Sequence, residues 1–289
     1  MKPLLKRIIL YFCWTFGLFR LTRYLNRKKL LILCYHGFEI IDESKFRPKL
    51  FIKKKTFHSR LEFIHKKGFH VLSLSEAIDR LKNHSLPNNS VVITIDDGFY
   101  STYSIAKDII RQYKYPCTIY VTTYYANKQT PILNLADQYI FWKTKETYNM
   151  LEYQKIEKSR ILSILNEKEI KILEEEGFDI QLHTHRHRFP INDAASAKKE
   201  IEDNKAFLEK IVKNRLIHFC YPSGIWDKSH LPYLKSMDIE SAVTCVPGFV
   251  DDKSNLLLLN RFLDSENISK IEFIAEITGF MDIVRNFIK

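Results

Sequence analysis

From residue 30 onward, short apolar runs rich in β-branched residues alternate with longer amphipathic segments. This alternation predicts buried parallel strands joined by crossover helices. The predicted strands are Leu30–Cys34, His70–Leu72, Val91–Ile95, Cys117–Val121, Phe178–Leu182, Ile217–Cys220, Ser241–Cys245 and Leu256–Phe262. The predicted helices are Thr56–Lys67, Ser75–Lys82, Tyr100–Gln112, Glu167–Glu176, Ala194–Val212 and Lys228–Lys235. Seven or eight such units in about 260 residues favour one (β/α) barrel over two domains.

A segment from Asn127 to about Asn166 interrupts the alternation. It is rich in Tyr, Lys and Glu and follows a predicted strand. Parallel barrels hold their sites at the carboxyl ends of their strands, so an insertion at that point would lie beside the mouth. We expect either a lid or substrate wall, or a peripheral addition.

The basic charge of the chain is concentrated at its N-terminus. The chain has 45 Lys and Arg against 34 Asp and Glu, yet residues 1–30 hold eight of the basic residues and no acidic one. The remainder is nearly neutral, which argues against a nucleic-acid partner. The apolar run Ile8–Phe19 is shorter than the roughly 20 residues that span a bilayer, and no small-residue cleavage site follows it.

We predict that residues 1–29 form a basic amphipathic helix on an anionic membrane surface, with Trp14 and other aromatic side chains inserted. The alternative is a helix packed on the body of the protein, residues 30–289. Five scattered cysteines without a C-x-x-C pair are typical of buried thiols in a reducing compartment. These features favour a cytoplasmic protein, peripheral to the inner face of the membrane. A periplasmic protein with an uncleaved N-terminal anchor is the alternative.

Three predicted strands end in residues that can carry chemistry. Asp96-Asp97-Gly98 follows the strand Val91–Ile95. Adjacent buried carboxylates repel each other and need a metal or a proton between them, although Asp-Gly is also an ordinary turn pair. HTHRH, residues 183–187, follows the strand Phe178–Leu182. Its outer histidines are four residues apart, a spacing at which two imidazoles commonly bind a transition metal; the alternative is a basic loop. The third is followed by YPSG, residues 221–224, a rigid turn that could aim a backbone N–H into the barrel mouth.

One carboxylate and two histidines together form a three-ligand site with open positions, suited to Zn²⁺ or another divalent metal that holds water. The second carboxylate could accept the proton of that water. The residue pattern leaves open which aspartate has which role. Two histidines and a carboxylate also describe an Fe(II) oxygenase, but the H-x-[DE] spacing of that site is absent.

The ordered motifs TIDDG, HTHRH and YPSG resemble those of the polysaccharide deacetylases, the NodB-homology or carbohydrate esterase 4 family. The segments ILCYHGF and TFHSRLEFIHKKGFHVLSLSEAI resemble the branch of that family with an N-terminal Tyr-His strand. The similarity covers residues 30 to 265. It implies a deformed (β/α)₇ barrel, to which the N-terminal amphipathic helix and the insertion at 127–166 are additions, and the hydrolysis of an N-acetyl group on an amino sugar.

The resemblance also implies roles for individual residues. Asp96 corresponds to the general base of the family and Asp97 to its metal-binding carboxylate. His183 and His187 match the two metal-binding histidines. The metal implied is Zn²⁺, with Ni²⁺, Co²⁺ and Fe²⁺ as alternatives.

Tyr221 matches the residue whose backbone N–H completes the oxyanion hole, and Pro222 in the same turn is expected to bind substrate. The chain departs from the family pattern at two positions. Cys220 stands where many members have an arginine, and no C-terminal histidine supplies the general acid. The Tyr-His branch points instead to His36 as that acid. Arg261 is a candidate for orienting the general base and for binding substrate, or is an ordinary surface arginine.

The sequence therefore predicts a metal-dependent carbohydrate N-deacetylase whose substrate is an N-acetylated cell-envelope glycan or its lipid-linked precursor. Two alternatives remain open. One is a deformylase or other amidohydrolase on a lipid-linked sugar, and the other is a catalytically silent module that binds an envelope glycan.

Overall fold

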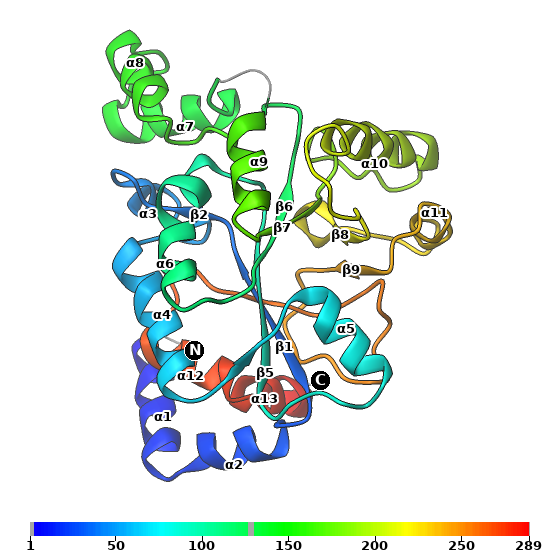
Figure 1. Ribbon diagram of the computed structural model, residues 1–289. Coiled ribbons are helices and arrows are strands. Elements are labelled where there is room, and N and C mark those ends of the chain that lie inside the picture. The colour runs from blue at the N-terminus through cyan, green and yellow to red at the C-terminus, as the bar shows by residue number, and fades with distance from the viewer. Residues whose placement is uncertain (1–2, 127–129, 289) are drawn as a thin grey trace.

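The computed structural model describes residues 3–126 and 130–288, and its centre is one curled sheet of parallel strands surrounded by helices (Figure 1). The strand order is β10-β1-β5-β6-β7-β8-β9, and β4 pairs with β5. The strands are β1 (Leu30–Tyr35), β4 (His70–Val71), β5 (Ser90–Ile95), β6 (Thr118–Val121), β7 (Asp179–Leu182), β8 (His218–Cys220), β9 (Ser241–Val243) and β10 (Phe262–Leu263). The predicted parallel α/β fold is confirmed.

The segment 256–263 links the two edges of the sheet. The N–H of Thr244, just after β9, donates to the carbonyl of Leu259, whereas Phe262 pairs with Leu33 of β1. The segment therefore changes partners part-way along, and only its end, β10, is a strand. This explains why the predicted strand Leu256–Phe262 is much shorter in the structure.

Strands β1 and β5 are buried along their whole length because both of their faces are covered. Alternate residues of β1 enter different clusters: Leu31 and Leu33 join the large core, and Leu30 and Ile32 join a smaller cluster. These strands therefore read as continuous apolar runs in the sequence.

The helices that cover the sheet include all those predicted, with small shifts of their ends. They are α4 (Lys54–Lys66), α5 (Leu74–Lys82), α6 (Lys107–Gln112, after a π-helical turn at Thr102–Ala106), α9 (Glu167–Glu175), α10 (Ala194–Leu208) and α11 (His230–Ser236). The predicted rigid turn at 221–224 is a 3₁₀ turn, Pro222–Gly224. Elements that the sequence pattern does not predict are β2 (Gly37–Phe38), α3 (Glu43–Phe46), β3 (Phe51–Ile52), α12 (Lys270–Ile277) and α13 (Phe280–Ile288).

The described part of the predicted insertion holds two helices joined by turns and isolated bridges; residues 127–129 lie outside the described residues. It contains α7 (Leu133–Thr144) and α8 (Met150–Ser159). Helix α7 packs on α3 through Tyr139, whose ring centroid lies 5.4 Å from that of Phe46 and whose hydroxyl donates to Asp42. Figure 1 places α7 and α8 at the end of the molecule opposite α1 and α2.

The N-terminal segment, expected as one helix, forms two: α1 (Pro3–Thr15) and α2 (Leu18–Leu25). The break falls at Gly17, whose φ of 76° is a left-handed conformation that glycine adopts without a steric penalty. Leu10 and Phe19 pack both helices onto α12. Among the described residues, no helix combines the length and the apolar character that crossing a membrane requires.

Candidate active site

The predicted site residues meet at the carboxyl end of the sheet. His36 follows β1, Asp96 and Asp97 follow β5, and the loop that carries His183 and His187 follows β7. Because β1, β5, β6 and β7 are parallel neighbours, their carboxyl ends lie on one side of the sheet. The motifs, which are far apart in the sequence, therefore lie close together in space.

Asp97, His183 and His187 form a compact group of potential metal ligands. Oδ1 of Asp97 lies 3.2 Å from Nε2 of His183 and 3.3 Å from Nε2 of His187. The two imidazole centroids are 4.9 Å apart. Atoms bound at about 2.0–2.1 Å to a tetrahedral metal lie roughly 3.3 Å from one another, so these separations fit a divalent ion.

Hydrogen bonding around His183 supports this fit. Nδ1 of His183 donates to the carbonyl of Cys220 at 2.8 Å, which leaves the lone pair of Nε2 directed at Asp97. A lone pair facing a carboxylate at 3.2 Å requires a cation, either a proton or a metal, between the two atoms. The donor set of two imidazoles and one carboxylate is one that Zn²⁺ and related ions accept.

The pKa shifts of the group have the same origin. Burial is the largest single effect and disfavours the charged forms of Asp97 and His183, but their hydrogen bond and the neighbouring charges together outweigh it. The pKa of Asp97 is thereby lowered to about 2, and that of His183 is raised. Burial lowers the pKa of His187, the more exposed histidine. The carboxylate is therefore ionised at neutral pH, as a metal ligand must be.

Left-handed backbone conformations concentrate at this site. Asp97, Thr184, His187 and Ser223 have φ values of 68°, 64°, 55° and 56°. A side chain makes this region unfavourable, and such strain persists only where the surrounding structure enforces it. The strain thus falls on the motifs that the sequence analysis singled out.

Two side chains of α10, which the sequence analysis missed, hold the histidine loop. Asn204 accepts a hydrogen bond from the N–H of His183 at 2.9 Å and donates to the Val121 carbonyl at 2.9 Å. Glu200 accepts from the N–H of Arg186 at 2.7 Å. The sequence does contain a signal for these two residues: they are polar side chains that fall, at helical spacing, on the apolar face of α10.

Asp96 is held by a buried arginine. Nη1 and Nη2 of Arg261 each lie 2.7 Å from one oxygen of the Asp96 carboxylate. Burial opposes ionisation of Asp96, but the guanidinium outweighs it and keeps the pKa of this carboxyl well below its usual range. Arg261 is therefore the partner of Asp96, as one of the sequence interpretations proposed.

Arg261 is not placed to bind substrate, and that expectation is corrected. Its side chain is fully buried. Its five N–H donors contact Asp96 twice, the carbonyl of Thr244, the hydroxyl of Thr94 and the sulfur of Cys220. No donor is left for a ligand.

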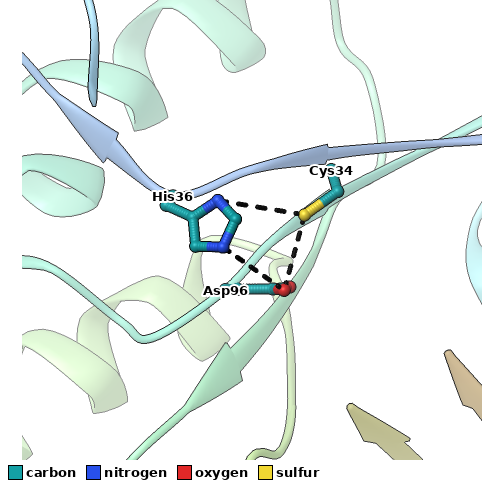
Figure 2. A group of neighbouring side chains, drawn as sticks. All are labelled: Cys34, His36 and Asp96. Atoms are coloured by element: carbon teal, nitrogen blue, oxygen red, sulfur yellow. Dashed lines mark hydrogen bonds and ion pairs between the residues drawn. The ribbon is translucent and has the colours of Figure 1, made fainter. Parts of the chain in front are cut away.

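His36 and two thiols complete the surroundings of Asp96. Figure 2 shows His36 with its Nε2 turned toward Oδ2 of Asp96, 3.8 Å away, and Cys34 beside both. Sγ of Cys34 donates to the same oxygen at 3.4 Å, and Sγ of Cys220 does so at 3.3 Å. The burial of these thiols is predicted from the sequence, but their contact with Asp96 is not.

The structure corrects the expectation for Tyr221. Its N–H donates to the carbonyl of Val243 at 3.2 Å as part of the sheet, and its hydroxyl donates to Leu257. The N–H is therefore committed and cannot complete an oxyanion hole. Pro222 is buried and has no N–H, so the first free-standing amide of the turn belongs to Ser223, which is exposed. The burial of Pro222 also argues against its predicted substrate contact.

The middle histidine of the loop, His185, points away from the metal-ligand group. Its Nδ1 lies 2.8 Å from the hydroxyl oxygen of Thr123, and its carbonyl accepts from the N–H groups of Thr123 and Tyr124. It fastens the histidine loop to the end of β6.

Comparison with known proteins gives a consistent result. The family model described as polysaccharide deacetylase matches residues 83–242. The chain is 23% identical to the Bacillus subtilis protein YxkH over 252 residues, 86% of this chain and 76% of that protein. It is 21% identical to the poly-β-1,6-N-acetyl-D-glucosamine N-deacetylase of Staphylococcus aureus, over 75% of this chain and 68% of that enzyme.

A similar fold occurs in the solved structure of the Streptococcus pyogenes deacetylase PplD in complex with acetate. The TM-score is 0.69 at 23% identity, and the match covers 86% of this chain and 98% of that chain. The shared fold includes the curled sheet whose carboxyl end carries the residues described above.

Proposed function

The chain belongs to the polysaccharide deacetylase family, and we propose that it removes the N-acetyl group from an amino sugar of a cell-envelope glycan. The acetyl carbonyl would lie between Asp96 and His36 on one side and the metal-ligand group Asp97, His183 and His187 on the other. The observation that carries the proposal is this placement: a metal-ligand group lies directly beside a paired, permanently charged carboxylate. The relative from Staphylococcus aureus acts on poly-N-acetylglucosamine, which supports a polymer of that kind as the substrate.

A divalent metal would be held by Asp97, His183 and His187. When bound, it supplies a positive charge that polarises the substrate carbonyl and makes a water molecule more acidic. The acceptor for the proton of that water is Asp96. The ion pair with Arg261 keeps Asp96 charged throughout the working pH range, so that it is ready to accept.

The remaining steps need an acid and an oxyanion donor. His36 is the histidine that reaches the Asp96 side of the site, and in its protonated form it can donate a proton to the leaving amine. We assign the oxyanion contact to the backbone N–H of Ser223 in place of Tyr221, because it is the first amide of the turn that the sheet does not use.

The direct test is acetate release from defined substrates. The metal-stripped protein is incubated with N-acetylglucosamine oligomers, N-acetylated nucleotide sugars and lipid-linked sugars, before and after Zn²⁺, Ni²⁺, Co²⁺ or Fe²⁺ is added back. We expect metal-dependent acetate release, fastest with the oligomers. An N-formyl sugar cleaved faster than its N-acetyl counterpart would favour a deformylase, and no release from any substrate would contradict the proposal.

The proposed membrane partner involves the opposite end of the molecule. More than half of the exposed large apolar side chains of the described residues belong to α1, α2 and their connection: Leu4, Leu5, Ile8, Ile9, Tyr11, Phe12, Trp14, Phe16, Leu18, Leu21, Tyr24 and Leu25. With the basic charge of this segment, they support its contact with an anionic bilayer. The protein should sediment with phosphatidylcholine vesicles only when these contain phosphatidylglycerol.

We further propose that the protein works on the cytoplasmic face of that membrane. Cys34 and Cys220 both donate to Asp96 as thiols, a contact that oxidation would remove. A periplasmic location with an uncleaved anchor is the competing proposal. Labelling of the intact cell with a membrane-impermeant reagent, directed at a reporter fused to the C-terminus, separates the two locations.

A further inference from the structure

An open cavity of about 700 Å³ is lined in part by the two N-terminal helices, which precede the start of β1, whereas the site lies beyond the end of that strand. Its walls come from α1, α2, α4 and α12. Trp14, Phe63 and Ile274 contribute apolar surface within it. The volume is in the range of pockets that hold small-molecule ligands.

Four cations and no acidic residue line this cavity: Arg20, Arg23, Lys67 and Lys270. The guanidinium of Arg20 and the ammonium of Lys67 make no ion pair or hydrogen bond with any described residue. Lys270 has Glu62 of α4 as a nearby counter-charge, whereas Arg20 and Lys67 have none among the described residues. The cations repel one another, and an anion between them would relieve that repulsion.

Arg23 differs from the other cations because it is fixed in place. Its Nε donates to Oδ1 of Asn89 at 3.0 Å, and Nη2 donates to the carbonyl of Lys67 at 2.7 Å. Its guanidinium also lies 4.3 Å from the centroid of the Phe69 ring. Arg23 thus joins α2 to the end of α4 and holds that side of the cavity open.

The opposite end of α1 is charge-balanced. Lys6 forms an ion pair of 2.8 Å with Glu272 of α12, and Nε of Arg7 lies 3.9 Å from the same carboxylate. The helix pair is therefore fastened to α12 at the start of α1, whereas the cations near Gly17 are left without an acidic partner. The cations that lack an acidic partner therefore lie at the cavity.

We propose that the cavity binds one anionic phospholipid, taken from the membrane on which α1 and α2 lie. The phosphate would meet Arg20 and Lys67, and the glycerol and upper acyl segments would lie on the apolar surface formed by Trp14 and Phe63. A neutral occupant would cover the four cations without compensating them, whereas an anionic amphiphile matches both the charge and the apolar surface. The inference rests on the proposed membrane contact and does not depend on the deacetylase activity.

The test uses dihexanoyl phosphatidylglycerol and dihexanoyl phosphatidylcholine below their critical micelle concentrations, because monomeric lipid reports on the cavity and not on adsorption to a bilayer. Isothermal titration calorimetry of the full chain should give one phosphatidylglycerol per chain, bound at least about tenfold more tightly than phosphatidylcholine. Inorganic phosphate should not compete at the same concentration, because it leaves the apolar surface uncovered. Equal binding of both lipids, or full competition by phosphate, would overturn the proposal.

The double variant R20Q/K67Q removes two cations that have no partner in the fold, so it should keep the melting temperature of the parent. We expect it to bind dihexanoyl phosphatidylglycerol about 30-fold more weakly, as two lost contacts near an anionic headgroup imply. The control K168Q/K171Q removes two exposed cations of α9 and should bind like the parent. The same loss in both variants would reduce the effect to net charge and contradict a site.

Vesicle sedimentation separates this proposal from the membrane contact itself. If the parent sediments with phosphatidylglycerol vesicles but does not bind the monomeric lipid, the cavity assignment is wrong and the membrane contact stands. If neither occurs, both proposals fail.

Discussion

The two ends of the sheet balance their charges in different ways. At the carboxyl end, the two aspartates of the site have partners within the chain: Arg261 faces Asp96 at 2.7 Å, and two histidines face Asp97 at 3.2 and 3.3 Å. At the amino end, Arg20 and Lys67 have no such partner among the described residues. The first end needs only a small cation to be complete, whereas the second needs an anionic partner from outside the chain.

Strand β1 connects these two ends and sets the distance between them. It runs from Leu30, directly after α2, to Tyr35, directly before His36. Five steps of about 3.3 Å give roughly 17 Å along the strand. A membrane contact through α1 and α2 would therefore turn the site away from the bilayer (Figure 1). That orientation favours a polymeric glycan over a sugar held at the bilayer surface by its lipid.

The largest expected effect is loss of the metal-ligand group. His183→Ala and His187→Ala should each abolish binding of one divalent ion per chain and lower kcat/KM at least about 10³-fold, because the polarising charge is lost. His185→Ala is the matched control, since its side chain contacts Thr123 and should leave the metal in place. Metal content by mass spectrometry checks this; full metal in the His183→Ala or His187→Ala protein would end the assignment.

The next largest effect should distinguish the roles of Asp96 and Asp97. Asp96→Asn should keep the metal and lose at least about 10²-fold in kcat, which is the scale of general-base catalysis. Asp97→Asn should lose the metal as well as the activity. Metal content and kcat are measured on the same preparations. Identical behaviour of the two variants would show that the distinct environments of these carboxylates do not reflect distinct roles.

The role of His36 can be tested by changing the leaving group. Its removal should lower amide hydrolysis about 10²-fold, because an amine leaves only after it is protonated. An activated acetate ester has a phenolate leaving group that needs no acid, so His36→Ala should hydrolyse it at nearly the parent rate. Equal losses on amide and ester would assign His36 to the support of Asp96, 3.8 Å away, instead.

The sequence predicted the carboxyl end better than the amino end, for physical reasons. Asp96, Asp97 and His183 follow buried strands, and the strand pattern is strong enough to place strand ends. Gly17 is a local signal for a helix end, but the packing of both N-terminal helices onto α12 is a tertiary contact that the residue pattern does not predict. The cavity beneath them joins residues more than two hundred positions apart, and helical periodicity says nothing about such contacts.

Errors within the site have a similar origin. Tyr221 was assigned from its position in a motif, but its N–H is used by β9, and only the pairing of β8 with β9 shows this. Cys34 and Cys220 look apolar in the sequence because their thiols matter only once Arg261 brings Asp96 between them. Residue type and order predict which groups are present, whereas tertiary contacts decide which of their atoms remain free.

The smallest effect concerns the amino end of β8 and should appear in stability alone. His218 is buried there between the hydroxyls of Ser75 and Ser241, both 2.8 Å from its ring nitrogens. Burial lowers its pKa to about 4. The unfolded chain takes up this proton near pH 6.5, so between these values the unfolded state binds more protons and stability falls as the pH falls. The cost should be about 2 kcal/mol at pH 5.

His218→Gln removes the titrating group but keeps side-chain polarity. Its free energy of unfolding should fall less than that of the parent between pH 6.5 and 5, as denaturant titration at each pH measures. Its kcat should match that of the parent at neutral pH, because His218 lies at the start of β8 and the catalytic groups lie beyond the strand ends. A variant with the same pH slope as the parent would mean that the acid sensitivity arises at another histidine whose pKa burial lowers, such as His187 at the carboxyl end.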